Sequence, residues 1–385
     1  MFVSRSRRRV AFIAKFAGYL IVIGATAQAA WNTLGPVHEL GAGITPGISS
    51  DAKGGIHVVM MVDGRIVYRC GDRHGRFNPP ESVPVPEGAG VYNSPHVVCD
   101  AAGIVHLVFE RDFTSRSQKA WYSNRQDGKW RAPVKALDRT GTERRINYPR
   151  LAVQGSTVYV AAFAGGGSVI AKLIDVTSAP RVARTVESPL WAAHPLIDPA
   201  GGIWVVGRAG PRGHQLERYS EALELRGERV LLSKATPNKT GEPTAAILDR
   251  AGVVHAAGVT RSTPNMEVIW YNTNVRAAAG QPVIVGPEIG DHVKEYTFPV
   301  LLEDARGRIY VSYRHNRTDE AKLAVFDPAT EKFATPVTVA PTTTKRLRWN
   351  PHLAAAPGGG VLVIWEDEGK VRFRAVGEAA ETGSR

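Results

Sequence analysis

The side chains that could perform chemistry recur at one position of a repeated sequence pattern. Seven copies of the pattern follow one another about fifty residues apart, and each carries an Asp-x-x-Gly turn or a degenerate form of it. The residues four positions before these turns are Gly47, His96, Arg150, His194, Ala245, Val300 and His352. Imidazole exchanges protons near neutral pH and guanidinium binds carboxylates. This register therefore predicts acid–base chemistry on an anionic ligand, or its binding.

Each copy predicts the strands that would position these side chains. A short apolar strand starts at the shared register, and a β-branched and aromatic strand follows the turn, which is typical of a β-hairpin. Two further strands follow, at residues 119–124 and 129–137 in the second copy. Four antiparallel strands per copy form the blade of a β-propeller, so the sequence predicts an all-β fold with seven blades.

The seventh copy ends after its third strand, at residues 371–376. The missing fourth-strand pattern, an aromatic residue followed by Pro-Val, occurs at residues 31–40 and matches the strands that begin at Trp130 and Phe333. An unpaired edge strand invites aggregation, and a closed ring removes it. We therefore expect the N-terminal strand to complete the last blade and close the ring.

Equivalent positions in a propeller lie on one circle about its axis. His96, Arg150, His194 and His352 should therefore share one mouth of the central channel. Other polar and aromatic residues flank this register or end the second strands, and they should reach the same face: Tyr92, Arg111, Tyr148, Tyr313, Arg314 and Trp349. Aromatic rings with polar tips suit contacts with sugars. A histidine at the start of a strand can also be an ordinary satisfied polar group, and this alternative stays open.

Other histidines and acids carry a structural interpretation. His57, His106 and His255 each lie six residues after a turn aspartate, where other blades have Trp204 and Tyr310, so they are predicted to pack at the far end of the hairpin. The turn aspartates are predicted to cap nearby backbone N–H groups. A metal site formed by the three ring histidines is an alternative, but we expect no cofactor.

The first 29 residues have the pattern of a secretory signal peptide. A cluster of arginines precedes an apolar run at residues 16–25 and a small-residue site, Ala27-Gln28-Ala29. We expect cleavage before Ala30, a mature propeller over residues 30–378, a disordered tail at 379–385 and a secreted or periplasmic location. An uncleaved anchor is the alternative, although the apolar run is shorter than the roughly 20 residues of a membrane span.

The charge and the cysteine content indicate which partners and which covalent links to expect. The formal net charge is +12, and removal of four arginines and Lys15 with the signal peptide leaves +7. An exported basic protein is expected to meet anionic glycans or surfaces rather than nucleic acid, and a basic surface that serves solubility alone is the other interpretation. Cys70 and Cys99 are the two cysteines, and a disulfide between them is one of two open alternatives.

The repeat resembles a known superfamily. The pattern P-x-Φ-x-x-D-x-x-G-x-Φ-H/Y-Φ, with a later aromatic-x-x-P-V strand, is similar to that of sialidase-like (BNR-type) propellers over essentially the whole mature chain. The sialidase Asp-box, S-x-D-x-G-x-T-W, is absent. Seven-bladed secreted members without Asp-boxes look like polysaccharide lyases of the ulvan-lyase type. This resemblance implies β-elimination with His and Tyr as proton-transfer groups and Arg neutralising a uronate.

The resemblance gives the ring residues expected roles. Arg150 would neutralise the uronate carboxylate, His96 or His352 would act as the base, and Tyr148 or Tyr313 would act as the acid. The remaining expected substrate-binding residues are His194, Arg314, Tyr92, Trp349 and Arg111. We expect a monomer that acts on acidic polysaccharide or another glycan. A lectin-like propeller without catalysis and a glycoside hydrolase of the sialidase superfamily are the alternatives.

Overall fold

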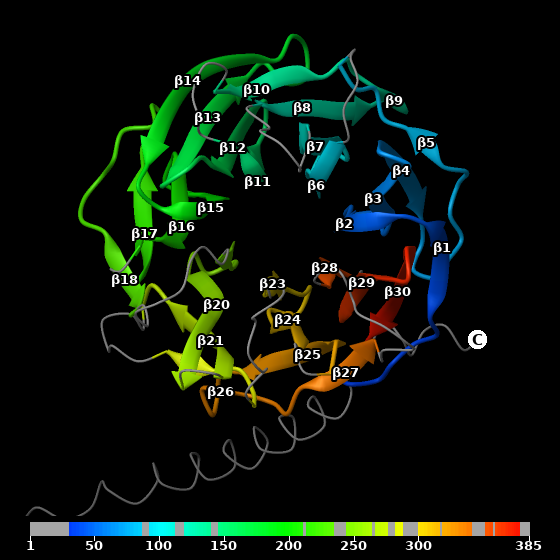
Figure 1. The fold of residues 1–385 in the computed structure, drawn as a ribbon, viewed down its shortest axis with the longest axis vertical. Helices are drawn as coiled ribbons and strands as arrows, with labels where there is room; N and C mark the ends of the chain where they lie inside the picture. Colours follow the sequence, from blue (N-terminus) through cyan, green and yellow to red (C-terminus); the bar gives the residue numbers. More distant parts are fainter. Residues whose placement is uncertain are drawn as a thin grey trace, which may run out of the picture.

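A computed structural model describes residues 31–86, 92–111, 119–139, 145–210, 213–234, 244–263, 266–275, 282–287, 299–315, 318–340, 351–356 and 359–377. Within these residues, seven antiparallel sheets surround a central axis (Figure 1). The predicted seven-bladed β-propeller is confirmed. The predicted signal peptide, the predicted tail and Trp349 lie outside the described residues.

The first four blades follow the chain outward from the axis. Blade one contains β2 (Ile44–Ser50), β3 (Ile56–Val62), β4 (Arg65–Gly71) and β5 (Glu81–Ser82). Blade two contains β6 (Tyr92–Cys99), β7 (Val105–Arg111), β8 (Lys119–Gln126), β9 (Lys129–Trp130) and β10 (Val134–Asp138). Blade three contains β11 (Asn147–Gln154), β12 (Thr157–Phe163), β13 (Ser168–Ile174) and β14 (Arg181–Ser188). Blade four contains β15 (Trp191–Ile197), β16 (Ile203–Arg208), β17 (His214–Tyr219) and β18 (Val230–Ser233).

The last three blades complete the ring. Blade five contains β19 (Ala245–Leu248), β20 (Val254–Thr263), β21 (Met266–Thr273) and β22 (Val283–Ile284). Blade six contains β23 (Val300–Glu303), β24 (Ile309–His315), β25 (Glu320–Asp327), β26 (Lys332–Phe333) and β27 (Val337–Ala340). Blade seven contains β28 (His352–Ala355), β29 (Val361–Asp367), β30 (Lys370–Val376) and the N-terminal strand β1 (His38–Ala42).

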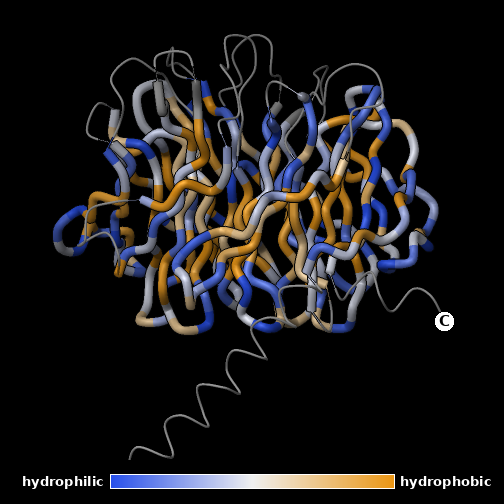
Figure 2. Tube along the Cα trace, turned by 90° about the horizontal axis from the view of Figure 1, so that it is seen from below, coloured by the Kyte–Doolittle hydropathy of each residue, from blue (hydrophilic) through white to orange (hydrophobic). Residues whose placement is uncertain are grey.

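The hydrophobic core lies between neighbouring blades. The second strands are rich in β-branched residues because both of their faces are covered, and β29 is buried along its whole length. One cluster, for example, joins Val108 and Tyr122 of blade two to Leu151 and Val160 of blade three. Figure 2 shows the hydrophobic residues concentrated at mid-height, with hydrophilic residues toward both faces. This arrangement holds the innermost strands rigidly around the axis.

The N-terminal segment closes the ring as predicted. β1 pairs with β30, with His38 opposite Phe373, and Leu34 forms an isolated bridge with Val376. The guanidinium of Arg374 donates hydrogen bonds to the carbonyl oxygen of Gly35 at 2.9 and 2.6 Å. Trp31 is 4% exposed and packs in the cluster between blades six and seven. The last sheet is therefore completed from the other end of the chain.

Three histidines stabilise the far ends of their hairpins. In each case Nε2 contacts the turn aspartate and Nδ1 contacts a tyrosine hydroxyl. The Nε2–carboxylate distances are 3.2 Å for His57–Asp51, 3.2 Å for His106–Asp100 and 2.9 Å for His255–Asp249. The Nδ1–hydroxyl distances are 2.8 Å for His57–Tyr68, 2.7 Å for His106–Tyr122 and 2.6 Å for His255–Tyr271. The structural interpretation of these histidines is confirmed.

Cys70 and Cys99, in blades one and two, are free thiols in the structure. Burial and the nearby carboxyl groups of Asp51 and Asp100 raise the pKa of the Cys99 thiol to about 12. Across the described part of the chain, no helix has the length and apolar character that crossing a membrane requires.

Candidate functional site

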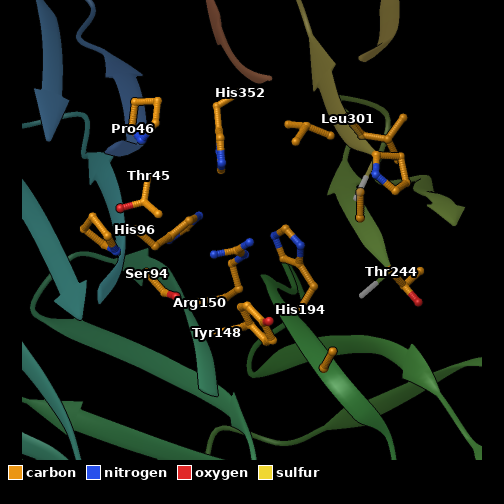
Figure 3. Close-up of a pocket in the computed structure, with 15 residues that line it drawn as sticks. Thr45, Pro46, Ser94, His96, Tyr148, Arg150, His194, Thr244, Leu301 and His352 are labelled. Atoms are coloured by element: carbon orange, nitrogen blue, oxygen red, sulfur yellow. The ribbon is translucent and has the colours of Figure 1, made fainter. Parts of the chain in front are cut away.

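The four ionisable residues of the predicted ring line one cavity at the axis. Its volume is about 110 Å³, and its walls include the first residues of the innermost strands. His96, Arg150 and His194 come from three consecutive blades, and His352 reaches toward them from the opposite wall (Figure 3). The prediction that shared register becomes spatial convergence is confirmed for these four side chains.

A repeated backbone irregularity aims these side chains. In the first four blades the register of the innermost strand shifts immediately before the ring position. The residue at each shift has a left-handed backbone, with φ of 48° at Thr45, 49° at Ser94, 53° at Tyr148 and 49° at Ala192. Such conformations cost non-glycine residues on the order of 1–3 kcal/mol, and bulges commonly redirect side chains beside functional sites. All four residues line the cavity.

The histidine rings have defined contacts. The centroids of the His96 and His194 rings lie 6.4 Å apart, with the rings nearly perpendicular at 86°. The backbone N–H of Leu151 donates a hydrogen bond of 3.3 Å to Nδ1 of His96. Because Nδ1 accepts this hydrogen bond, the neutral ring carries its own proton on Nε2. His96 is therefore a hydrogen-bond donor at Nε2 in this arrangement.

The cavity keeps its imidazoles neutral. Burial lowers the pKa of His194 to about 3 and that of His352 to about 3, and the charge of Arg150 acts in the same direction. Burial, Arg150 and the other two imidazoles hold the pKa of His96 well below its usual range. At neutral pH the cavity thus contains three uncharged imidazoles around one guanidinium.

Arg150 has unused hydrogen-bonding capacity. Within the described residues its guanidinium makes one hydrogen bond, a long one of 3.4 Å from Nη1 to the carbonyl oxygen of Pro149, and no ion pair. Burial lowers its pKa to about 10, and the acidic groups of Glu110 and Tyr148 oppose this shift. A guanidinium has five N–H donors, so Arg150 can still bind an anion through two parallel hydrogen bonds, as a bidentate contact.

A buried acid behind the cavity was missed by the sequence reasoning. Glu110 lies on β7, is 0% exposed, and accepts a hydrogen bond of 3.0 Å from the Ser94 hydroxyl. Burial raises its pKa to about 8, against the opposing effects of Ser94, the Tyr148 backbone N–H and Arg150. The second-strand register that singled out Arg314 also contains Glu110. Applying that register to blade two would have found it.

Of the remaining predicted site residues, some line the cavity and others do not. Tyr148 lines the cavity. Tyr313 is 1% exposed and packs in the core between blades five and six, because its side of β24 is turned toward blade five. Arg314 is buried and forms an ion pair with Asp319. Tyr92 and Arg111 pair through their backbones, but their side chains lie outside the description, as does Trp349.

The channel continues beyond the ring. This second space, about 550 Å³, shares His96, His194 and His352 with the cavity and is otherwise lined mainly by apolar residues such as Leu196 and Leu302. Among the described residues, no group of three or more His, Cys, Asp or Glu side chains is placed to hold a metal ion. The ring histidines instead surround a guanidinium (Figure 3).

Comparisons with known proteins bear on the fold. No family model matches the sequence, and no curated protein matches it. A fungal alcohol oxidase of the AA5 family, solved in complex with copper, is similar at 12% identity and TM-score 0.58 over 90% of this chain and 76% of that chain. An α-L-arabinanase from Penicillium chrysogenum, complexed with arabinobiose, is 11% identical at TM-score 0.47 over 77% of this chain and 98% of that chain. The Hadza microbial sialidase Hz136 is 12% identical at TM-score 0.47 over 84% and 76%. Likeness at this level concerns the fold alone.

Proposed function

We propose that this protein binds uronate-containing acidic polysaccharide at the channel mouth and cleaves it by β-elimination. The observation that carries the proposal is Arg150, a guanidinium without an ion pair in the described residues, enclosed by three neutral imidazoles. Such a site favours a carboxylate over a neutral group because Arg150 supplies the positive charge. The predicted export of the basic chain would bring it to such polymers.

The size of the cavity limits how a polymer binds. A cavity of about 110 Å³ is too small for a whole oligosaccharide, so most of the polymer would lie outside it. Arg150 can donate hydrogen bonds to both carboxylate oxygens, and Nε2–H of His96 can donate a further hydrogen bond. This geometry selects a sugar with an acidic substituent at the point that enters the ring.

Elimination requires neutralisation of the uronate, a base at C5 and an acid at the leaving oxygen. The C5–H electron pair forms the C4–C5 double bond, the bond from C4 to the glycosidic oxygen breaks, and that oxygen receives a proton. His352, across the cavity from Arg150, suits the base, and Tyr148 suits the acid. A bound carboxylate would offset the charge of Arg150 and so raise the pKa of His352 from about 3.

A lectin-like function is the second candidate, and one observation favours it. A pKa of about 3 makes His194 and His352 weak bases in the unliganded site, whereas efficient general bases have pKa values near the working pH. A binding protein needs the guanidinium and the donors but no basic imidazole. The two functions share a ligand and differ in whether a product forms.

The test combines binding with product detection. The mature protein is incubated with a panel of acidic and neutral polysaccharides, while the ultraviolet absorbance of the unsaturated uronate product and the new reducing ends are followed. Arg150→Lys keeps the charge but loses the bidentate hydrogen bonding, so we expect binding to weaken at least tenfold. His352→Gln and Tyr148→Phe should abolish the absorbance change but retain binding.

Each outcome separates the candidates. Binding without any product supports the lectin-like function. Reducing ends without the unsaturated product indicate hydrolysis and contradict elimination. Equal binding of neutral and acidic polymers, or full binding by the Arg150→Lys variant, would contradict the carboxylate site itself.

A further inference from the structure

Glu110 is a buried acid whose hydrogen bonding is incomplete. Its Oε1 accepts the bond from Ser94, whereas Oε2 has no hydrogen-bond partner in the described residues. Buried carboxylates normally have hydrogen-bond partners, since an unpaired buried polar atom destabilises the folded protein. An exception directly behind a ligand cavity calls for a functional reason.

The backbone bulge does not require this acid. The corresponding second-strand residues behind the four bulges are Met61, Glu110, Phe163 and Arg208. Thr45 adopts the same left-handed backbone as Ser94, although the residue behind it is Met61. An apolar side chain therefore suffices where the chain needs the bulge alone. The carboxyl group of Glu110 must be explained by its other neighbours.

Those neighbours connect it to the anion site. Three groups favour its ionised form: the Arg150 guanidinium and the Tyr148 backbone N–H on β11, and the Ser94 hydroxyl on β6. On β8, the uncharged Ala120 lies opposite Glu110. Arg150 is thus the single charge among these neighbours. An anion that binds Arg150 would share this poorly hydrated region with the Glu110 carboxylate, and two negative charges repel strongly there.

We propose that Glu110, at pH values where it is ionised in the free protein, takes up one proton from solvent when an anionic ligand binds to Arg150, and so acts as the positioning residue that makes carboxylate binding depend on protonation. The proton joins the carboxylate, whose Oε2 is unpartnered, and no other bond changes. The inference rests on the proposed function, because it takes Arg150 as the anion-binding group. It extends that function by assigning a role to a residue that does not touch the ligand.

The direction of the pH dependence follows from linkage. In the free protein the pKa of Glu110 is about 8, and the charge of a bound anion would raise it further. Below that pH the group is already protonated and binding is unaffected. Above it, binding must be accompanied by protonation, so the Kd should rise by up to about tenfold per pH unit.

Isothermal titration calorimetry measures the proton directly. Glucuronate and, separately, inorganic sulfate are titrated into the mature protein at pH 7, 8 and 9, each in two buffers of different ionisation enthalpy. We expect uptake near zero at pH 7, up to about half a proton at pH 8 and approaching one at pH 9. Glu110→Gln should bind with no uptake and keep its affinity between pH 7 and 9.

Two further variants guard against a folding artefact. Glu217→Gln alters another fully buried glutamate, which is bonded to Ser188 and Tyr219 away from the cavity, and it should leave proton uptake unchanged. Ser94→Ala removes a bond that favours the ionised form of Glu110, so the pKa of Glu110 in the free protein should rise and the midpoint of uptake should move to higher pH. That shift tests the inference even where Glu110→Gln does not fold.

The outcomes distinguish the two proposals. Glucuronate binding without proton uptake, or uptake that persists in Glu110→Gln, overturns the role of Glu110 and leaves the proposed function intact. Proton-linked binding of sulfate with no binding of glucuronate supports that role and contradicts the uronate specificity. Binding of neither anion at any pH contradicts both.

Discussion

The neutral imidazoles of the ring should make the protein sensitive to acid. His352 has a pKa of about 3 in the folded chain, against an ordinary value of 6.5, so the unfolded chain binds more protons between these values. Its stabilising contribution is therefore complete above pH 6.5 and is lost as the pH falls toward 3. At about 1.36 kcal/mol per unit of pKa, lowering the pH to 5 should cost about 2 kcal/mol for this residue.

Urea denaturation at pH 7.5 and pH 5 tests this reasoning. His352→Gln keeps a polar side chain of similar size but cannot be protonated, so it should lose about 2 kcal/mol less free energy of unfolding than the wild type over this interval. Glu110 titrates with the opposite sign, but it is present in both proteins and cancels. His74→Gln, at an exposed site, is the control. An acid sensitivity equal to that of the wild type in His352→Gln would refute the reasoning.

Two other predictions concern the scaffold. Tyr122→Phe removes the hydroxyl that contacts Nδ1 of His106, so urea denaturation should show a loss of about 1–2 kcal/mol while calorimetry shows unchanged glucuronate affinity. A change in affinity would mean that the hairpin ends influence the site. Trp31→Ala empties the space that the N-terminal segment fills between blades six and seven, and it should cost about 3–5 kcal/mol. A cost below about 1 kcal/mol would show that ring closure contributes little to stability.

Much of the fold was predictable because its causes are local. The Asp-x-x-Gly turns and the β-branched strands define each hairpin within some fifteen residues. The count of seven follows from repetition, and closure follows from a fourth-strand pattern displaced to residues 31–40. The far-end histidines were equally predictable, since His106 and Asp100 belong to the same hairpin.

The candidate site was predictable only in part. The ring of His96, Arg150, His194 and His352 came from register, which needs no knowledge of distances between blades. Tyr313 was predicted as a proton donor but lies in the core between blades. Adjacent residues of a strand point to opposite faces of the sheet, and in a propeller those faces pack against the neighbouring blades. A residue at the end of a second strand therefore does not have to reach the channel.

The sequence by itself therefore determined the blades, their number, their closure and the circle on which the ionisable residues lie, because each depends on contacts within a repeat or on its period. The tertiary structure alone decided the protonation and the available donors of those residues. The Nδ1 of His96 accepts a hydrogen bond from the backbone N–H of Leu151, 55 residues away, and the charge of Arg150 in the next blade lowers the pKa of Glu110. Burial by neighbouring blades sets these pKa values, and burial arises only when the ring is assembled.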